Sequence, residues 1–335
     1  MQEDVNITAG WETVTCDFCG SERASLFIDD LSDTTNFTEG KFTLVECNEC
    51  GLIYLNPRPS FKILGKYYND DYYEKETGKR FNSSAESILD ALRSLRVNYI
   101  RRYRRQGEIL DIGCGRGDLL ARMKKMGWGT CGIQISENSI SAAKINYGLN
   151  ILYGDFVDLD LGSRQFDVVS FFYVLEHVHR PKAYLEKARN LLKPGGVIIV
   201  SIPNGDSLQA KFFRGKWLIL EPPRHLYLFK AKAFTPILRE LKLEILASNS
   251  FAWDMNPFSL LQSLMNLFIF PQNAFFSVLK HKRVKNRYKS PALTTFTSCL
   301  AAVTLAPLTI VLSIFLSLAA SGDIITYVLR KKNDR

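Results

Sequence analysis

The chain has 335 residues, a formal net charge of +9 and 46% hydrophobic residues. The basic excess is compatible with partners that carry phosphate, such as nucleic acid, a nucleotide-sugar or an anionic lipid. Seven cysteines are present, but residues 1–4 do not begin a secretory signal. We therefore expect a reducing cytosol, which argues against a secreted, disulfide-bonded protein.

Two Cys-x-x-Cys-Gly motifs stand near the N-terminus. They contain Cys16, Cys19, Cys47 and Cys50. Each motif places two thiolates on a turn that a glycine tightens, and together they offer the four ligands of a tetrahedral structural zinc ion. The segments 42–46 and 52–55 flank the second motif as two strands. The pattern predicts a zinc ribbon over residues 1–56, with disulfides as the alternative.

A helical connector is expected over residues 57–106. Ser83 or Ser84 caps a helix that runs through Tyr103, after a break at residues 56–59. One face of this helix is apolar. The other face carries Arg93, Arg96, Arg101, Arg102, Arg104 and Arg105. Such a face predicts phosphate binding, and a merely solvated helix is the alternative.

A short apolar strand, 108–112, runs directly into a Gly-x-Gly-x-Gly turn. Gly113, Gly115 and Gly117 permit positive φ and let the backbone approach a ligand closely. A helix then begins at Asp118 and leaves free backbone N–H groups at the turn. The third glycine comes one residue too early for the dinucleotide pattern, which argues against NAD. A simple tight turn is the alternative.

The segment Leu110-Asp111-Ile112-Gly113-Cys114-Gly115-Arg116-Gly117 resembles the first motif of the class I S-adenosylmethionine (SAM) dependent methyltransferases. The resemblance implies a Rossmann-like α/β fold with a seven-stranded sheet and SAM as cofactor. It covers a core of residues 107–251, with an acceptor insertion at about 204–230. By resemblance, the cofactor is held by Asp111, Gly113, Cys114, Gly115 and Gly117.

Downstream segments alternate between strand and helix patterns. Strands are expected at 130–135, 150–155, 166–173 and 197–202, and helices at 137–147 and after Pro181. This alternation predicts a mostly parallel sheet whose ligands lie at the carboxyl ends of the strands. Two last strands are expected at 243–247 and 324–329, the second antiparallel, within a final segment 323–335 that ends in a basic tail.

The resemblance also places cofactor contacts at the strand ends. The usual acidic, ribose-binding position is Gln134, followed by Ile135, and its amide can still hydrogen-bond a diol. Asp155 is expected at the adenine amino group with Phe156 beside the ring, and a turn role is the alternative for Asp155. Tyr173, at the end of the fourth strand, is also expected at the cofactor.

Two histidines are candidate catalytic residues. His177 follows the fourth strand, and an imidazole there can take a hydroxyl proton. His225 falls where the family inserts acceptor-binding elements, with Arg224 and Tyr227 as companions. Alternatively, His177 shapes the SAM pocket and His225 is a structural anchor. The segment 173–178 lacks the Asn/Asp-Pro-Pro-aromatic motif that similar enzymes use for base amines, so we expect methylation of oxygen or carbon.

Residues 252–322 are strongly apolar. Met255–Leu279 and Ser290–Gly322 contain no charged residue. A basic cluster separates them and consists of Lys280, Lys282, Arg283, Lys285, Arg287 and Lys289. More than about 20 apolar residues can cross a bilayer. Since the strands before and after belong to one sheet, a single crossing is excluded, and a re-entrant or interfacial helical pair is predicted. Buried helices over the sheet are the alternative.

These features predict a SAM-dependent methyltransferase attached to the cytoplasmic side of a membrane, monotopic or peripheral, with a soluble cytoplasmic enzyme as the alternative. The expected acceptor is a small molecule, a glycan-linked compound or a lipid. An RNA methyltransferase is a second possibility, because of the ribbon, the net charge and the arginine-rich helix. An RNA methyltransferase would have no use for the two apolar segments without charge, Met255–Leu279 and Ser290–Gly322. A non-catalytic membrane scaffold is a third, and Gln134 favours it.

Overall fold

The computed structural model describes residues 10–35, 38–68, 81, 83–269, 272–280 and 290–332. Its centre is a seven-stranded sheet with the strand order β12-β13-β10-β9-β6-β7-β8. The strands are β6 (Glu108–Ile112), β7 (Gly129–Gln134), β8 (Ile151–Tyr153), β9 (Phe166–Phe172), β10 (Leu192–Pro203), β12 (Leu243–Asn249) and β13 (Ile324–Lys331). From β10 to β8 the neighbours are parallel, whereas β13 is antiparallel to both β10 and β12. The predicted Rossmann-like α/β fold is confirmed.

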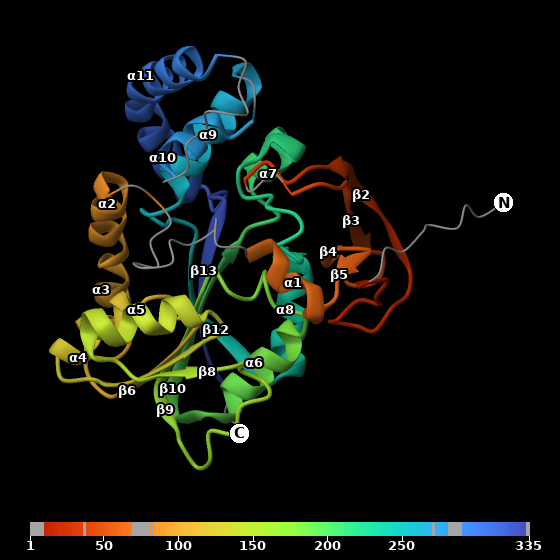
Figure 1. Ribbon diagram of the computed structural model, residues 1–335. Coiled ribbons are helices and arrows are strands. Elements are labelled where there is room, and N and C mark those ends of the chain that lie inside the picture. Colours follow the sequence, from red (N-terminus) through yellow and green to blue (C-terminus); the bar gives the residue numbers. More distant parts are fainter. Residues whose placement is uncertain are drawn as a thin grey trace.

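Helices cover both faces of this sheet (Figure 1). They are α4 (Asp118–Lys125), α5 (Glu137–Tyr147), α6 (Pro181–Asn190) and α8 (Ala231–Glu240). The apolar strands drive this layering: alternate residues of β6 are buried against α4 and α5 on one face and against α6 and α8 on the other. Ser136 caps α5 as its sequence predicts, since its Oγ accepts a hydrogen bond from Ser139 N at 3.3 Å.

The N-terminal region forms a four-stranded sheet in the order β11-β4-β3-β2. Its strands are β2 (Ala24–Leu31), β3 (Phe42–Cys47), β4 (Ile53–Leu55) and β11 (Tyr227–Leu228), and beside them β1 (Trp11–Glu12) pairs with β5 (Arg58–Pro59). The sequence predicts β3 and β4 but neither β2 nor β11. Because β11 comes from the acceptor insertion and pairs with β4, the ribbon and the insertion form one sheet.

The connector contains α1 (Phe61–Leu64), η1 (Gly65–Tyr68), α2 (Ser83–Arg93) and α3 (Leu95–Arg101). The single predicted helix is therefore interrupted at Ser94. Its predicted basic face is also wrong in part. Arg96 forms an ion pair with Asp254, and its guanidinium carbon lies 4.7 Å from the Phe172 ring centroid. This arginine turns inward because an acid and an aromatic ring meet it there, which helical periodicity alone does not reveal.

Beyond the end of the sheet lie α9 (Asn256–Phe268), α10 (Ala274–Leu279) and α11 (Pro291–Leu318), grouped together as Figure 1 shows. With 28 residues, α11 is about 42 Å long, and it has the length and composition to cross a membrane. Pro307 lies inside it without ending it. The basic residues 282–289 lie outside the described residues, whereas Lys280 ends the second of these helices and is buried.

The apolar helices begin and end at one sheet. β12 precedes α9, β13 follows α11, and the two strands pair directly, with Leu243 opposite Lys331. Between β10 and β12, the chain also forms α7 (Leu208–Phe213) and η2 (Arg214–Lys216). The pairing confirms that the strands before and after the apolar segment belong to one sheet, so the chain leaves this sheet before α9 and returns to it after α11.

Candidate active site

A cavity of about 1430 Å³ opens at the carboxyl ends of β6, β7 and β9. The predicted site residues that line it are Asp111, Gly113, Cys114, Gly115, Gln134, Ile135, Asp155, Phe156, Tyr173, His177 and His225. Gly117 and Tyr227 are not among its lining residues. The cavity therefore joins the glycine turn to the histidines, and it continues upward between α2, α9 and α10, where Phe258, Phe276 and Leu279 line it.

The glycine turn presents bare backbone to this cavity. Gly113 N and Cys114 N donate to Ile133 O at 2.9 and 3.2 Å, which fixes the turn on β7. A Cβ at Gly113 would lie 2.6 Å from Val174 Cγ2, so packing requires glycine there. At Gly115, with φ +54°, a Cβ would meet no protein atom within 4 Å. The free space beside Gly115 suits a ligand that approaches the main chain.

Asp111 lies buried at the end of β6, at the floor of the cavity. Burial raises the pKa of its carboxyl to about 6, although the Ser170 hydroxyl and Arg96 act in the opposite direction. Ser170 Oγ donates to Asp111 Oδ1 at 2.7 Å. The carboxylate is thus held in one orientation, and it can accept a hydrogen bond from, or pair with, a cationic ligand group.

Gln134 stands at the position where the family usually has an acid. Its Oε1 accepts hydrogen bonds from Ile135 N at 2.7 Å and from Ser136 N at 3.3 Å. The amide oxygen is therefore engaged at the start of α5, and the NH₂ group is the part that can meet a ligand. Gln134 can donate to a ribose oxygen, whereas an acid would accept from a ribose hydroxyl.

Asp155 follows β8, takes part in a turn and lies at the cavity wall. Its Oδ1 accepts a hydrogen bond from Val157 N at 3.1 Å, and this contact stabilises the turn. The same oxygen accepts a hydrogen bond from Tyr184 Oη at 2.8 Å. Asp155 also lines the cavity. Phe156 is buried, and its ring packs edge-on against Tyr184 with centroids 5.4 Å apart. The aromatic contacts hold this turn rigidly at the cavity wall.

Tyr173 begins the segment after β9 with a φ of +61°, which non-glycine residues rarely adopt. Its hydroxyl donates to Asp254 Oδ1 at 3.3 Å, and burial raises its pKa well above the usual range. The Arg96 guanidinium carbon lies 5.1 Å from its ring centroid. The sequence placed Arg96 on an outer basic face and gave no reason to select Asp254, because each residue lies far along the chain from the strand that it supports.

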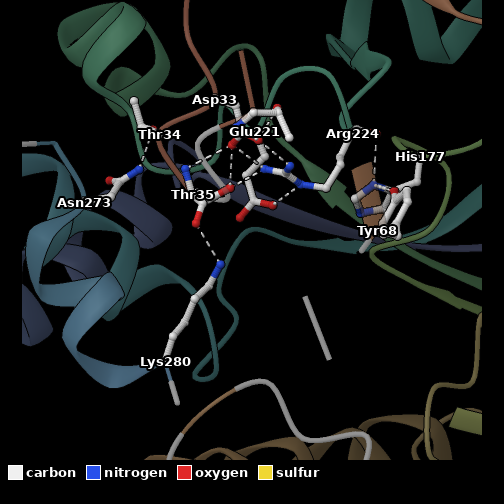
Figure 2. A network of polar contacts seen from close by, with 10 residues as sticks. Asp33, Thr34, Thr35, Tyr68, His177, Glu221, Arg224, Asn273 and Lys280 are labelled. Carbon is white, nitrogen blue, oxygen red and sulfur yellow. Dashed lines mark hydrogen bonds and ion pairs between the residues drawn. The ribbon is translucent and has the colours of Figure 1, made fainter. Parts of the chain in front are cut away.

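His177 and His225 meet at the acceptor end of the cavity, with ring centroids 4.5 Å apart. His177 Nδ1 lies 2.8 Å from Tyr68 Oη and 3.1 Å from Arg224 O (Figure 2). Burial, reinforced by His225, lowers the pKa of His177 well below its usual range, so its imidazole is neutral at pH 7. Burial also raises the pKa of Glu176 to about 8. The sequence brought the two histidines to notice but gave no reason to select Tyr68 or Glu176.

A buried polar network supports this histidine pair, as Figure 2 shows. The Arg224 guanidinium donates to both carboxylate oxygens of Asp33 at 2.9 Å and to Thr35 Oγ1. Lys280 Nζ donates to Thr35 O at 2.9 Å. The loop after β2 thus links the acceptor insertion to the end of α10, and Arg224 faces His177 with its carbonyl while its side chain reaches Asp33.

Tyr227 was predicted beside His225, but the structure does not bring its hydroxyl to the acceptor. Tyr227 Oη accepts from Arg58 Nη1 at 2.7 Å and donates to His179 O at 3.1 Å. The residue belongs to β11 and pairs with Tyr54 of β4, which turns the side chain toward the connector. Its place in the ribbon sheet makes it a structural residue.

The four cysteines of the ribbon come together. Their Sγ atoms all lie within 4.8 Å of one another, with Cys16 and Cys50 at 3.4 Å and Cys19 and Cys47 at 3.5 Å. Four thiolates 2.3 Å from a tetrahedral zinc ion stand about 3.8 Å apart, so the cluster fits that donor set. The Cys50 thiol and burial raise the pKa of the Cys16 thiol, and a cation would offset this effect.

Comparison with known proteins agrees with this geometry. Residues 85–248 match the profile of a methyltransferase domain family. A ubiquinone biosynthesis O-methyltransferase of Cereibacter sphaeroides is 40% identical over 101 residues, which are 29% of this chain and 41% of that protein. Its counterpart in Paraburkholderia xenovorans is 35% identical over 102 residues, 29% of this chain and 44% of that protein. The chain thus spans less than half the length of these relatives.

Solved structures are similar at low sequence identity. A SAM-dependent methyltransferase from Archaeoglobus fulgidus has a TM-score of 0.43 and 18% identity, covering 79% of this chain and 99% of that one. Magnesium protoporphyrin IX methyltransferase from Synechocystis, with bound SAH, has a TM-score of 0.44 and 19% identity, covering 56% of this chain and 91% of that one.

Proposed function

We propose that this chain, whose residues 85–248 match a methyltransferase domain family, transfers a methyl group from SAM to a hydroxyl oxygen of an amphiphilic small molecule at a membrane surface. The observation that carries the proposal is the continuous cavity from the glycine turn, past His177 and His225, to the apolar helices α9 and α10. The named relatives, which are O-methyltransferases of ubiquinone biosynthesis, support oxygen as the acceptor atom.

The cofactor end of the cavity fits SAM. The bare backbone at Gly115 admits close approach, and the Asp111 carboxylate matches the cationic amino group of a methionine moiety. The Gln134 amide donates to a ribose oxygen, and Asp155 takes the adenine end. Gly117 supports the turn from behind, since a Cβ there would lie 2.6 Å from Leu149 Cδ1.

When bound, SAM supplies the methyl group, whose bond to sulfur breaks with the electron pair left on sulfur while the acceptor oxygen forms the new carbon–oxygen bond. The chain orients the acceptor and removes its proton. The neutral imidazole of His177 can accept the hydroxyl proton and release it to solvent through the cavity mouth, and His225 lies beside it as a second candidate base. Tyr68 and the Arg224 carbonyl keep the His177 ring in place.

The acceptor arm of the cavity favours a molecule with an apolar part. Its walls include Leu218, Phe258, Phe275, Phe276 and Leu279, most of them from α9 and α10. The polar atoms at its inner end belong to Glu176, His177, Glu221 and His225. A hydroxylated head group fits the inner end, and an apolar tail fits the arm toward the helices. A lipid-like acceptor, such as a quinone precursor or a polyprenyl-linked saccharide, has this shape.

Attachment to the cytoplasmic face of a membrane is part of the proposal. α11 exposes Val303 at 74% and Phe315 at 63%, with further large apolar side chains between them. Both ends of the helical segment lie at the same sheet, which fits a monotopic arrangement and not a single crossing.

Methyl transfer is tested with the full chain reconstituted in liposomes and supplied with methyl-labelled SAM. Membrane lipid extract, soluble nucleotide-sugars and RNA serve as parallel acceptors. We expect alkali-stable label, as a methyl ether, in the lipid extract, and about a tenfold or larger loss of rate for His225→Asn. His179→Asn is the matched control, since His179 Nε2 bonds Pro59 O outside the cavity. Label in RNA alone would contradict the proposal, and failure to bind SAM in a calorimetric titration would favour a scaffold.

A structural zinc ion in the ribbon is the last part of the proposal. We expect one zinc per chain by elemental analysis, and its loss in Cys47→Ser together with a lower unfolding midpoint, because structural zinc contributes directly to folding. Cys299→Ser, at an exposed cysteine of α11, should keep the metal. Wild-type protein free of zinc after preparation without chelators would overturn this assignment.

A further inference from the structure

We propose a second metal site, in the cavity itself, at which Glu176, His177 and His225 bind a divalent cation such as Mn²⁺ or Fe²⁺. One ligand atom from each of these residues lies within 4.8 Å of the other two. Metal–ligand bonds of about 2.0–2.2 Å allow ligands up to about 4.4 Å apart, so small side-chain rotations complete the site. Two imidazoles and a carboxylate that leave positions open are a recurrent site for divalent transition metals.

Glu176 gives the first independent support. Its side chain is 1% exposed, and its Oε2 has no hydrogen-bond partner among the described residues. A buried carboxylate oxygen without a partner is costly, and a cation is one way to compensate it. The main chain holds Glu176 firmly, since its carbonyl accepts from Leu226 N at 2.6 Å. Its carboxyl group lines the cavity beside both histidines.

The tautomer of His177 gives the second support. Its Nδ1 lies 3.1 Å from Arg224 O, and a carbonyl oxygen can only accept a hydrogen bond. Tyr68 Oη lies 2.8 Å from the same nitrogen and can accept as well. In the tautomer in which Nδ1 donates to Arg224 O, the lone pair that a cation needs is on Nε2. Histidines that bind metals nearly always donate their other ring N–H in this way, often to a main-chain carbonyl. The buried pair of Arg224 and Asp33 fixes the residue that supplies this carbonyl.

The local charge balance agrees with a cation. Glu221 lines the same end of the cavity and adds a second carboxylate close to Glu176. The nearest guanidinium, that of Arg224, is engaged by Asp33 and lies 3.6 Å from Glu221 Oε2. Glu176 and Glu221 thus have one buried arginine beside them, and Asp33 already pairs with that arginine. A divalent cation that displaces the proton of Glu176 would balance the charge of these two carboxylates.

The position gives the cation a role that rests on the proposed function. The site lies at the acceptor end of the cavity, where the hydroxyl of an acceptor would reach the open coordination positions. A cation there would lower the pKa of that hydroxyl, so the proton would leave to solvent and the imidazoles would act as ligands and not as bases. Binding itself is independent of methyl transfer, so the two proposals fail separately.

Binding is tested with Mn²⁺, because this ion has little preference for the thiolates of the ribbon. The full chain in detergent is titrated while the free Mn²⁺ signal is followed by electron paramagnetic resonance. We expect one Mn²⁺ per chain, and at least tenfold weaker binding in Glu176→Gln and His225→Asn. His179→Asn, on the same segment but outside the cluster, should bind as the wild type does. Unchanged binding in the first two variants would overturn the site.

A second measurement does not depend on the folding of variants. Pulsed resonance spectra of Mn²⁺ bound to the wild-type chain should show couplings to imidazole nitrogen, and their absence would refute the ligand set. SAM affinity by calorimetry reports whether each variant keeps its fold. Methyl transfer by metal-stripped protein should rise at least tenfold when Mn²⁺ is restored. An unchanged rate together with confirmed binding would overturn the catalytic role alone.

Discussion

The core sheet and the helix α11 bury opposite kinds of side chain. In the sheet, Ile109, Leu110 and Val168 are fully buried, as in a protein dissolved in water. In α11, the buried residues are Ser298, Ala302, Thr309 and Ser313, which are small or polar, while the large apolar residues face outward. The comparison teaches that the outer face of α11 carries the large apolar side chains that the core sheet buries, which is the distribution that the proposed membrane attachment requires.

Several buried polar side chains of the helical group form hydrogen bonds with one another or with the main chain, although Ser259 Oγ, Ser277 Oγ and Ser298 Oγ have no partner among the described residues. Gln262 Nε2 donates to Asn266 Oδ1, and Asn266 Nδ2 donates to Asn273 Oδ1, both at 2.9 Å. Thr309 Oγ1 and Ser313 Oγ donate to main-chain carbonyls one turn earlier in α11. A hydrocarbon environment demands such internal pairing because it offers no hydrogen bonds.

The largest effect is expected from charge on the outer face of α11. Val303→Glu with Phe315→Glu should release the chain from liposomes in a flotation assay, because a charge inside the bilayer costs about 2.5 kcal/mol or more. The matched control is Ile145→Glu with Met126→Glu, which charges exposed apolar residues of the core. Equal flotation of both double variants would remove the distinction between the two regions.

A smaller effect is expected at Asp323, which lies between α11 and β13. Burial raises its pKa to about 7, although Ser259 and Trp217 act in the opposite direction. A carboxyl whose folded pKa exceeds the unfolded value contributes stability below about pH 4 that is lost as the pH rises toward 7. Relative to Asp323→Asn, the free energy of unfolding should therefore fall with rising pH, by on the order of 4 kcal/mol.

Urea unfolding of both proteins at several pH values between 4 and 8 measures this difference. Other buried acids titrate alike in the two proteins, so subtraction isolates Asp323. If the free energies of unfolding of the two proteins change with pH in parallel, the carboxyl of Asp323 does not have the raised pKa.

The smallest effect concerns the glycine turn of the core. Gly115→Ala should weaken SAM binding at least tenfold by calorimetry, because its Cβ would enter the space beside the main chain in the cavity. Gly148→Ala is the control, since Gly148 has a φ of +59°, has equally free surroundings and ends α5 outside the cavity. Both substitutions carry the same backbone strain. Equal SAM affinities would show that Gly115 does not face the cofactor.

Much of the core was predictable because its signals are local. The run of apolar residues in β6, the glycines after it and the N-cap at Ser136 each act within a few residues of chain. The apolar composition of α11 is local too, but its orientation is not: only packing against α9 shows that Ser298 and Ser313 face inward. The prediction of a single basic helix failed at Arg96 because Asp254, its partner, is 158 residues away.

The sequence by itself determined the strands and helices of the α/β core, the four cysteines of the ribbon and the presence of a long apolar segment, since each depends on spacing along the chain. Only the tertiary structure decided which side chains share the cavity. In the fold, Glu176, His177 and His225 lie close together in the cavity. Tyr227 does not line the cavity, because its strand β11 pairs with β4. The reason is that side-chain position at this site depends on contacts between distant segments, which periodicity does not encode.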